Sequence, residues 1–288
     1  MKKLLSFALV LTLLLGIGSA LAIDAGHSRA VIGADLTEDQ INAVYATFGI
    51  QRGSVTELKV TNAEERQYLE GFVSSDKIGT RSISCVYIET LAEGSGLDVA
   101  AYNTDWCGKE MYVNALVTAG VTDAKVIVTA PFVVSGTAAL TGIYKAYESI
   151  TGEKLSEEAK VIGTQELVIT AELAEQIGNY DATAIVNELK LILDETKNMS
   201  DAELRDQIKA IAQQYNVSVT DGQIEQLITL CRSLETLDPD ALRARVESVQ
   251  SAIKNLAGAQ ETAGKIVTGI RNFFQAIGDF FSNLFNRS

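Results

Sequence analysis

Residues 97–130, LDVAAYNTDWCGKEMYVNALVTAGVTDAKVIVTA, decide the fold class of this chain. Strand-forming residues at 97–103 precede a predicted helix over 105–119, which Gly120 ends. A second strand is predicted at 124–130. A strand, a helix and a strand at this spacing predict a βαβ unit with parallel strands.

The segment before this unit predicts an antiparallel partner for its first strand. Residues 81–91 are rich in Ile, Val, Tyr and Cys, and the residues at 93–96, EGSG, are typical of a turn. We therefore expect 81–91 and 97–103 to pair as a β-hairpin. This pairing would bring Cys107 roughly level with Arg81.

Capping signals predict helices on both sides of these strands. A helix is expected after Thr37, where Gln40 completes a capping box, and another after Asn62, where Glu65 has the same role. A third helix is predicted at 137–149. The first part of the chain is therefore read as an α/β or α+β domain.

From residue 156 onward the strand signal nearly vanishes. Ser200 with Glu203 and Thr220 with Gln223 form capping boxes that open amphipathic helices. The second part is therefore predicted to be an all-α domain. The predicted organisation is a signal peptide at 1–22, an α/β domain at 23–155, a helical domain at 156–264 and an amphipathic C-terminal helix at 265–288.

The first 22 residues have the organisation of a signal peptide. Lys2 and Lys3 precede an apolar segment, and Ala20-Leu21-Ala22 has the small-x-small pattern that signal peptidase recognises. We expect cleavage after Ala22 and a secreted or extracytoplasmic mature protein. The sequence contains no second apolar run of the about 20 residues that a membrane span needs.

Composition excludes several classes of function. The chain has 37 acidic and 24 basic residues and a formal net charge of −13, which disfavours nucleic acid as a partner. His27 is the single histidine, so neither Ser-His-Asp catalysis nor a zinc site is expected. Cys85, Cys107 and Cys231 are widely spaced and are expected as free thiols. No nucleotide-binding or calcium-binding motif occurs, so no cofactor and no metal are predicted.

One stretch of the chain resembles a known family. The matching segments are NAL at 114–116, TAGV at 118–121, APF at 130–132, VSGTAALTG at 134–142 and KAYE at 145–148. They resemble the bacterial family of predicted secreted proteins catalogued as domain of unknown function 1002. The resemblance implies an exported protein of Gram-positive-type bacteria, and it implies no activity.

The carboxyl ends of the two parallel strands form the predicted ligand edge. The loops after residues 103 and 130 should lie side by side there, and the hairpin adds the start of 81–91. The candidate crevice comprises Arg81, Thr104, Asp105, Trp106, Cys107, Ser135 and Thr137. Hydroxyls and free backbone N–H groups at a helix N-terminus, beside an arginine, suit a carboxylate or a phosphate. A carbohydrate is the other candidate ligand, with Trp106, Tyr102 or Tyr112 stacked on the sugar ring.

Two other interpretations of this edge stay open. In the first, the polar residues are structural: Ser135 or Thr137 caps its helix. Asp105 then caps the preceding helix and pairs with Arg81. In the second, Cys107 or Ser135 is a catalytic nucleophile, although no histidine is available as its base.

The C-terminal segment carries a dense apolar stripe at helical spacing. Its members are Phe273, Phe274, Ile277, Phe280, Phe281, Leu284 and Phe285. The stripe could dock on the helical domain, bind a protein partner or a second copy of the chain, or lie on a membrane surface. Few basic residues accompany it, which weakens the case for the membrane surface.

Together these signals favour an exported binding or assembly protein at the cell envelope or in the extracellular space. The alternative is a hydrolase or transferase with its site at the carboxyl edge of the sheet. The sequence favours binding over catalysis because no nucleophile has an evident base.

Overall fold

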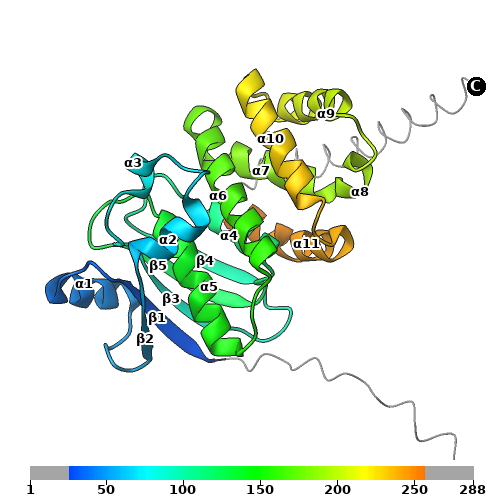
Figure 1. Cartoon of the computed structure of the whole chain (residues 1–288). Coiled ribbons are helices and arrows are strands. Elements are labelled where there is room, and N and C mark those ends of the chain that lie inside the picture. Colours follow the sequence, from blue (N-terminus) through cyan, green and yellow to red (C-terminus); the bar gives the residue numbers. More distant parts are fainter. Residues whose placement is uncertain (1–25, 257–288) are drawn as a thin grey trace, which may run out of the picture.

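The computed structural model describes residues 26–256 (Figure 1). The strands are β1 (Ser28–Gly33), β2 (Thr56–Val60), β3 (Cys85–Thr90), β4 (Leu97–Ala101) and β5 (Ala124–Thr129). The first helices are α1 (Glu38–Phe48), α2 (Asn62–Leu69), α3 (Ser75–Ile78), α4 (Lys109–Ala119) and α5 (Thr137–Thr151). They are followed by α6 (Glu157–Ile177), α7 (Asn179–Leu191), α8 (Leu193–Thr196), α9 (Asp201–Gln214), α10 (Asp221–Leu234) and α11 (Pro239–Leu256). The predicted signal peptide and the predicted helix at 265–288 lie outside the described residues.

The five strands form one mixed sheet in the order β2-β1-β3-β5-β4. β1 pairs with β2 in parallel and β4 pairs with β5 in parallel, while β3 is antiparallel to both of its neighbours. The carboxyl ends of four strands and the amino end of β3 therefore lie at the same edge. The predicted fold class, a mixed α/β sheet followed by a run of helices, is confirmed.

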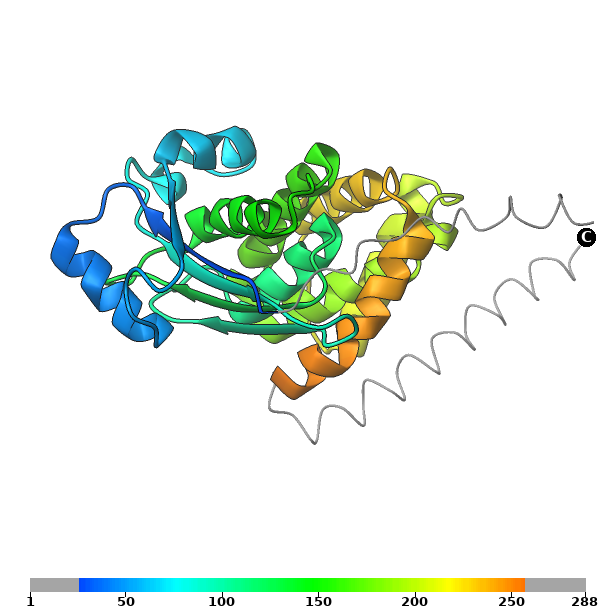
Figure 2. The ribbon, with the colours of Figure 1, turned by 90° about the horizontal axis from the view of Figure 1, so that it is seen from below.

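Both faces of the sheet are apolar. Alternate strand residues point to opposite sides, and apolar residues of both sets are buried. Val31, Val86 and Val126 belong to the cluster that contains α4 and α5. Ala30 and Tyr87 belong to a second cluster, which α1 covers. Figure 2 shows the sheet between α1 and α5.

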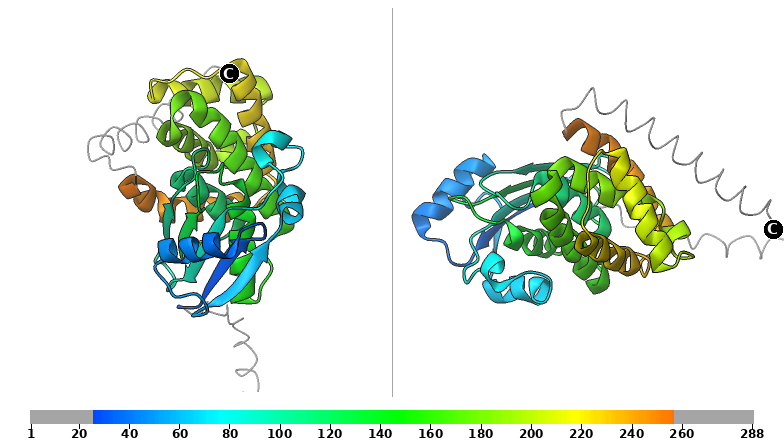
Figure 3. Two further views of the ribbon diagram at one scale, coloured as in Figure 1. Left: turned by 90° about the vertical axis from the view of Figure 1, so that its left-hand side faces the viewer. Right: turned by 90° about the horizontal axis from the view of Figure 1, so that it is seen from above.

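The larger hydrophobic cluster continues from the sheet into the later helices. Leu116 of α4, Leu167 of α6, Leu189 of α7 and Leu227 of α10 all belong to it. Figure 3 shows α9 and α10 at the end of the molecule opposite α1. One apolar core therefore underlies both halves of the described chain.

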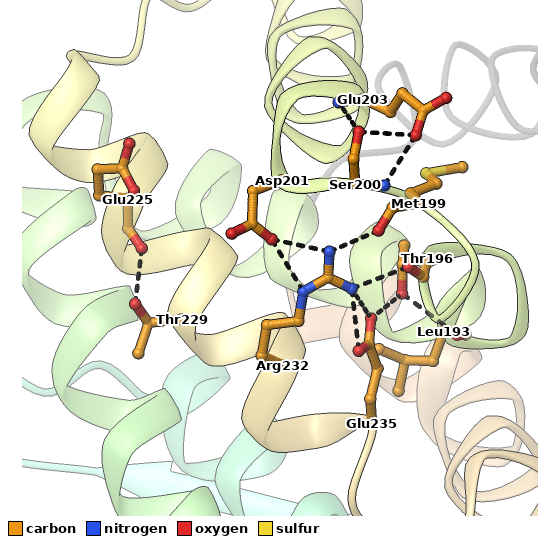
Figure 4. A network of polar contacts seen from close by, with 10 residues as sticks. All are labelled: Leu193, Thr196, Met199, Ser200, Asp201, Glu203, Glu225, Thr229, Arg232 and Glu235. Atoms are coloured by element: carbon orange, nitrogen blue, oxygen red, sulfur yellow. Dashed lines mark hydrogen bonds and ion pairs between the residues drawn. The ribbon is translucent and has the colours of Figure 1, made fainter.

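Arg232 of α10 connects several helix ends (Figure 4). Its guanidinium donates to the backbone oxygens of Thr196 and Met199, at 2.9 and 2.7 Å. It also pairs with Asp201, at the start of α9, and with Glu235. This arrangement fixes α8 and the α9 N-terminus against α10.

Most capping predictions are confirmed. Thr37 and Gln40 form the capping box of α1, which ends at Gly49 in the left-handed conformation. The predicted boxes of α9 and α10 are also present. The second helix departs from its prediction by one residue, because its box consists of Thr61 and Glu64.

The predicted hairpin between 81–91 and 97–103 is wrong. β5 lies between β3 and β4, which do not pair with each other. The residue that precedes β5 explains this arrangement: the backbone oxygen of Asp123 accepts from Leu91 N at 3.0 Å, and its Oδ1 accepts from Gly96 N at 2.8 Å. The turn at 93–96 therefore passes around the start of β5.

Candidate functional site

Two loops run side by side at the carboxyl edge, after β4 and after β5. Thr104 forms a parallel bridge with Val134. Asp105 N donates to Val134 O at 3.1 Å, and Cys107 N donates to Ser135 O at 3.0 Å. This is the juxtaposition that parallel strands predict, because their carboxyl ends share one edge.

A cavity of about 300 Å³ opens at this edge, between α3, the start of β3 and the N-terminus of α5. Its polar wall includes Glu65, Lys77, Arg81, Ser135 and Thr137. Three of the predicted site residues, Arg81, Ser135 and Thr137, thus meet around one space. The other four, Thr104, Asp105, Trp106 and Cys107, do not line it.

The N-terminus of α5 has no side-chain cap. Gly136, at a φ of 93°, precedes the helix and supplies no side-chain cap, and Ala139 N donates to Gly136 O at 3.2 Å. The predicted capping by Ser135 or Thr137 is therefore wrong. The Ser135 hydroxyl donates to Lys77 O at 3.2 Å, and the Thr137 hydroxyl donates to Glu65 Oε1 at 2.7 Å. The start of α5, at Thr137 and Ala138, consequently lies beside the cavity without a side-chain cap.

Glu65 is the buried carboxyl of the site, with 1% of its surface exposed. Besides Thr137, it accepts from Asn62 Nδ2 at 3.4 Å, and no ion pair joins it to a cation of the described residues. Burial raises the pKa of Glu65 to about 7, against the lowering effects of Thr137, Asn62 and Arg66. A carboxyl with this pKa, in a cavity, marks a candidate functional residue.

Arg81 and Lys77 supply the positive charge of the cavity. Arg81 is exposed, donates to Asp35 O at 2.7 Å and forms no ion pair within 26–256. Lys77, in contrast, pairs with Glu175 and lies 4.2 Å from the centre of the Trp106 ring. The Lys77 charge is thus partly neutralised, whereas that of Arg81 is available to a ligand.

The predicted structural roles of Asp105 are also wrong. α4 begins at Lys109 after Gly108, so Asp105 does not cap it. Arg81 bonds to Asp35 O instead of pairing with Asp105. The reason is that 105–107 extends along 134–135 as backbone before the helix starts.

The aromatic residues proposed to stack on a sugar lie elsewhere. Trp106 donates through Nε1 to Glu175 at 2.8 Å and is covered by Lys77. Tyr112 is buried, and its hydroxyl donates to Gly136 O at 2.7 Å. Tyr102 is exposed but does not line the cavity.

The cysteines are free and buried. Burial raises the pKa of the Cys107 thiol to about 12, an effect that a hydrogen bond with Tyr112 opposes. A thiol in this environment stays protonated and is a poor nucleophile. Cys107 therefore acts in packing, and its backbone holds the two loops together.

Two observations on the described residues bear on metals and membranes. No group of three His, Cys, Asp or Glu side chains within 26–256 could hold a metal ion. No helix of this part of the chain is long and apolar enough to cross a bilayer. The predicted stripe from Phe273 to Phe285 lies outside the described residues.

The sequence predictions missed Glu65 and Lys77 as site residues. The sequence predicts Glu65 in a capping box, a role that Glu64 fills in the structure. Lys77 belongs to the short helix α3. This helix has no side-chain cap, so no capping signal in the sequence predicts it. The sequence did contain a signal for Glu65. Glu64 and Glu65 are adjacent acids after Thr61, and a capping box uses only one of them, so the other is free for a different role.

Residues 32–255 match a family described as "Protein of unknown function (DUF1002)". The chain is similar to Uncharacterized protein YpuA of Bacillus subtilis (strain 168), with 39% identity over 266 residues, 91% of this chain and 88% of that protein. No solved structure matches the chain.

Proposed function

We propose that this chain, which belongs to the DUF1002 family of proteins of unknown function, binds a small organic anion at the carboxyl edge of its sheet. The observation that carries the proposal is the uncapped N-terminus of α5 beside the Arg81 guanidinium, both facing one cavity. Backbone N–H groups at a helix start and an arginine fork are complementary to carboxylate and phosphate oxygens.

The rest of the cavity wall supports an organic ligand. Its apolar members are Ile78, Ile83, Phe132, Val134 and Ala138. Phe132 is 44% exposed, so its ring is accessible from outside. A ligand with an anionic group and an apolar group would therefore find complementary surfaces.

The proposed place of action is outside the cytoplasm. Its support is the sequence pattern of residues 1–22, with cleavage after Ala22. In the same proposal, the stripe from Phe273 to Phe285 has one of three roles: it docks on the helical domain, it binds a protein partner or a second copy of the chain, or it lies on a membrane surface. Mass spectrometry of the secreted protein should find Ile23 as the first residue, and an extracellular form that keeps Met1 would contradict export by this route.

Binding can be tested by titrating the protein with sulfate or benzoate at pH 6 and measuring the heat of binding by calorimetry. Arg81→Gln removes the unpaired cation, and Lys125→Gln removes an exposed cation from a strand residue outside the cavity. A charge-assisted hydrogen bond contributes about 1.5–3 kcal/mol, so Arg81→Gln should weaken binding about tenfold or more. The Lys125 variant should bind as the wild type does. Equal affinity of the two variants, or no saturable binding of either probe, would contradict the proposal.

One observation favours a catalytic alternative, a hydrolase or transferase. The hydroxyl oxygens of Ser135 and Thr137 lie 3.3 Å apart, and Thr137 donates to Glu65. A continuous chain from Ser135 to Glu65 forms when the Ser135 hydroxyl donates to Thr137 Oγ1 instead of to Lys77 O. A carboxylate could accept a proton from Ser135 along this chain. Labelling of Ser135 by a fluorophosphonate, lost in Ser135→Ala and in Glu65→Gln, would support catalysis. A binding-competent protein that is not labelled would favour binding alone.

A further inference from the structure

Glu65 and the proposed anion would occupy the same cavity, next to the start of α5. The Glu65 carboxyl lies against the first residue of α5, where its Oε1 accepts from the Thr137 hydroxyl at 2.7 Å. Both residues line the cavity that also contains Arg81. An anion bound at the α5 N-terminus would therefore lie next to the Glu65 carboxyl.

We propose that the protein takes up its anionic ligand together with one proton, which resides on Glu65. This inference rests on the proposed function, since it concerns how the same cavity admits an anion. Two like charges in one buried site repel each other, and the pair is stabilised when one of them is protonated. A protonated Glu65 could also donate a hydrogen bond to the ligand through its hydroxyl group.

The charged and titratable groups around Glu65 leave it as the group that changes charge near neutral pH. The basic side chains near it are Arg66 of α2, Lys77 of α3 and Arg81. Burial raises the pKa of Cys107 and of Tyr112 on α4, so both stay neutral.

The position of Glu65 fits this role in a second respect. Burial raises its pKa to about 7, and a nearby anion that raises this pKa well further would hold Glu65 protonated across neutral pH. Glu64, the adjacent acid, faces Thr61 and Lys145 and does not line the cavity. Glu64 therefore belongs to the capping box of α2, whereas Glu65 lies at the cavity proposed to bind the anion.

Calorimetric titration with benzoate and sulfate between about pH 5.5 and pH 8.5 tests the proposal, because both probes remain ionised there. For the wild type, affinity should be nearly constant below about pH 6.5 and should fall about tenfold per pH unit well above pH 7. At pH 8, titrations in buffers of different ionisation enthalpy should show uptake of nearly one proton per probe bound.

Glu65→Gln should bind the probes with an affinity that is independent of pH and should take up no proton. Glu70→Gln, which changes an exposed acid of the same segment, should retain the wild-type pH dependence. Wild-type binding without proton uptake, or an unchanged pH profile in Glu65→Gln, would overturn the coupling and leave anion binding intact. Absence of binding to either probe at any pH would overturn the proposed function as well. The wild-type proton count decides the question even if Glu65→Gln folds poorly.

Discussion

Replacing Glu65 with glutamine should change how the folding stability of the protein depends on pH. Burial raises the pKa of Glu65 from its ordinary 4.5 to about 7, so the folded protein holds this proton more tightly than the unfolded chain does. The resulting stabilisation is complete below the unfolded pKa, and it is lost as the pH rises through the folded pKa. The wild type should therefore lose stability, relative to Glu65→Gln, as the pH rises from 5 to 8.

The size of this effect follows from the two pKa values. A pKa displaced from 4.5 to about 7 corresponds to about 3 kcal/mol over the whole titration. Most of it, about 2.5 kcal/mol, should appear between pH 5 and pH 8. For a chain of this size, that difference corresponds to a shift of roughly 5–10 °C in Tm.

Urea unfolding of the wild type, Glu65→Gln and Glu70→Gln at several pH values measures the effect. Glutamine keeps an oxygen that can accept from the Thr137 hydroxyl, so Glu65→Gln preserves the contact and removes only the titration. Glu70 is exposed, and its variant should follow the wild-type curve. If the free energies of unfolding of the wild type and Glu65→Gln change in parallel from pH 5 to pH 8, the Glu65 carboxyl does not titrate in this range and the reasoning is refuted.

Two further predictions concern helix packing. A Cβ at Gly163 of α6 would lie 2.7 Å from Ala115 O, so Gly163→Ala should destabilise the fold by about 1–3 kcal/mol. The control is Gly222→Ala, whose Cβ would have no atom within 4 Å, and it should be neutral or stabilising. Lys190 and Glu166 form a fully buried ion pair of 2.7 Å, so Lys190→Met should cost about 3–5 kcal/mol. Adding Glu166→Met should recover most of that cost, and chemical unfolding that shows additive losses in the double variant would contradict this reasoning.

Local signals predicted the helix ends of this fold better than they predicted its strand order. The capping boxes at Thr37 and Ser200 depend on residues three positions apart, and both are present. Strand neighbours depend on distant segments: β1 and β2 were not predicted, and β5 displaced the expected hairpin. Asp123, whose backbone and side chain bind the turn between β3 and β4, gives no such signal in the sequence.

The candidate site shows the same division. Arg81 lies at the predicted edge although its predicted strand partner was wrong, because β3 is antiparallel to β5 just as it was expected to be to β4. Strand direction alone was enough to place it with Ser135 and Thr137. Trp106 was misplaced because its side-chain partner, Glu175, comes from a helix that sequence spacing does not position. Asp105 was misplaced because its backbone extends along Val134 before α4 begins.

Glu65 shows why a local motif can conceal a functional candidate. A capping box needs one acid at the third position, and the pair at 64 and 65 offered two ways to satisfy it. With Thr61 as the cap, Glu64 is the third residue and bonds the cap backbone, so Glu65 is turned by about 100° around the helix axis. That rotation directs its carboxyl to Thr137 and the cavity. A displacement of one residue in the cap therefore converts an assumed structural acid into the group that we propose couples proton uptake to anion binding.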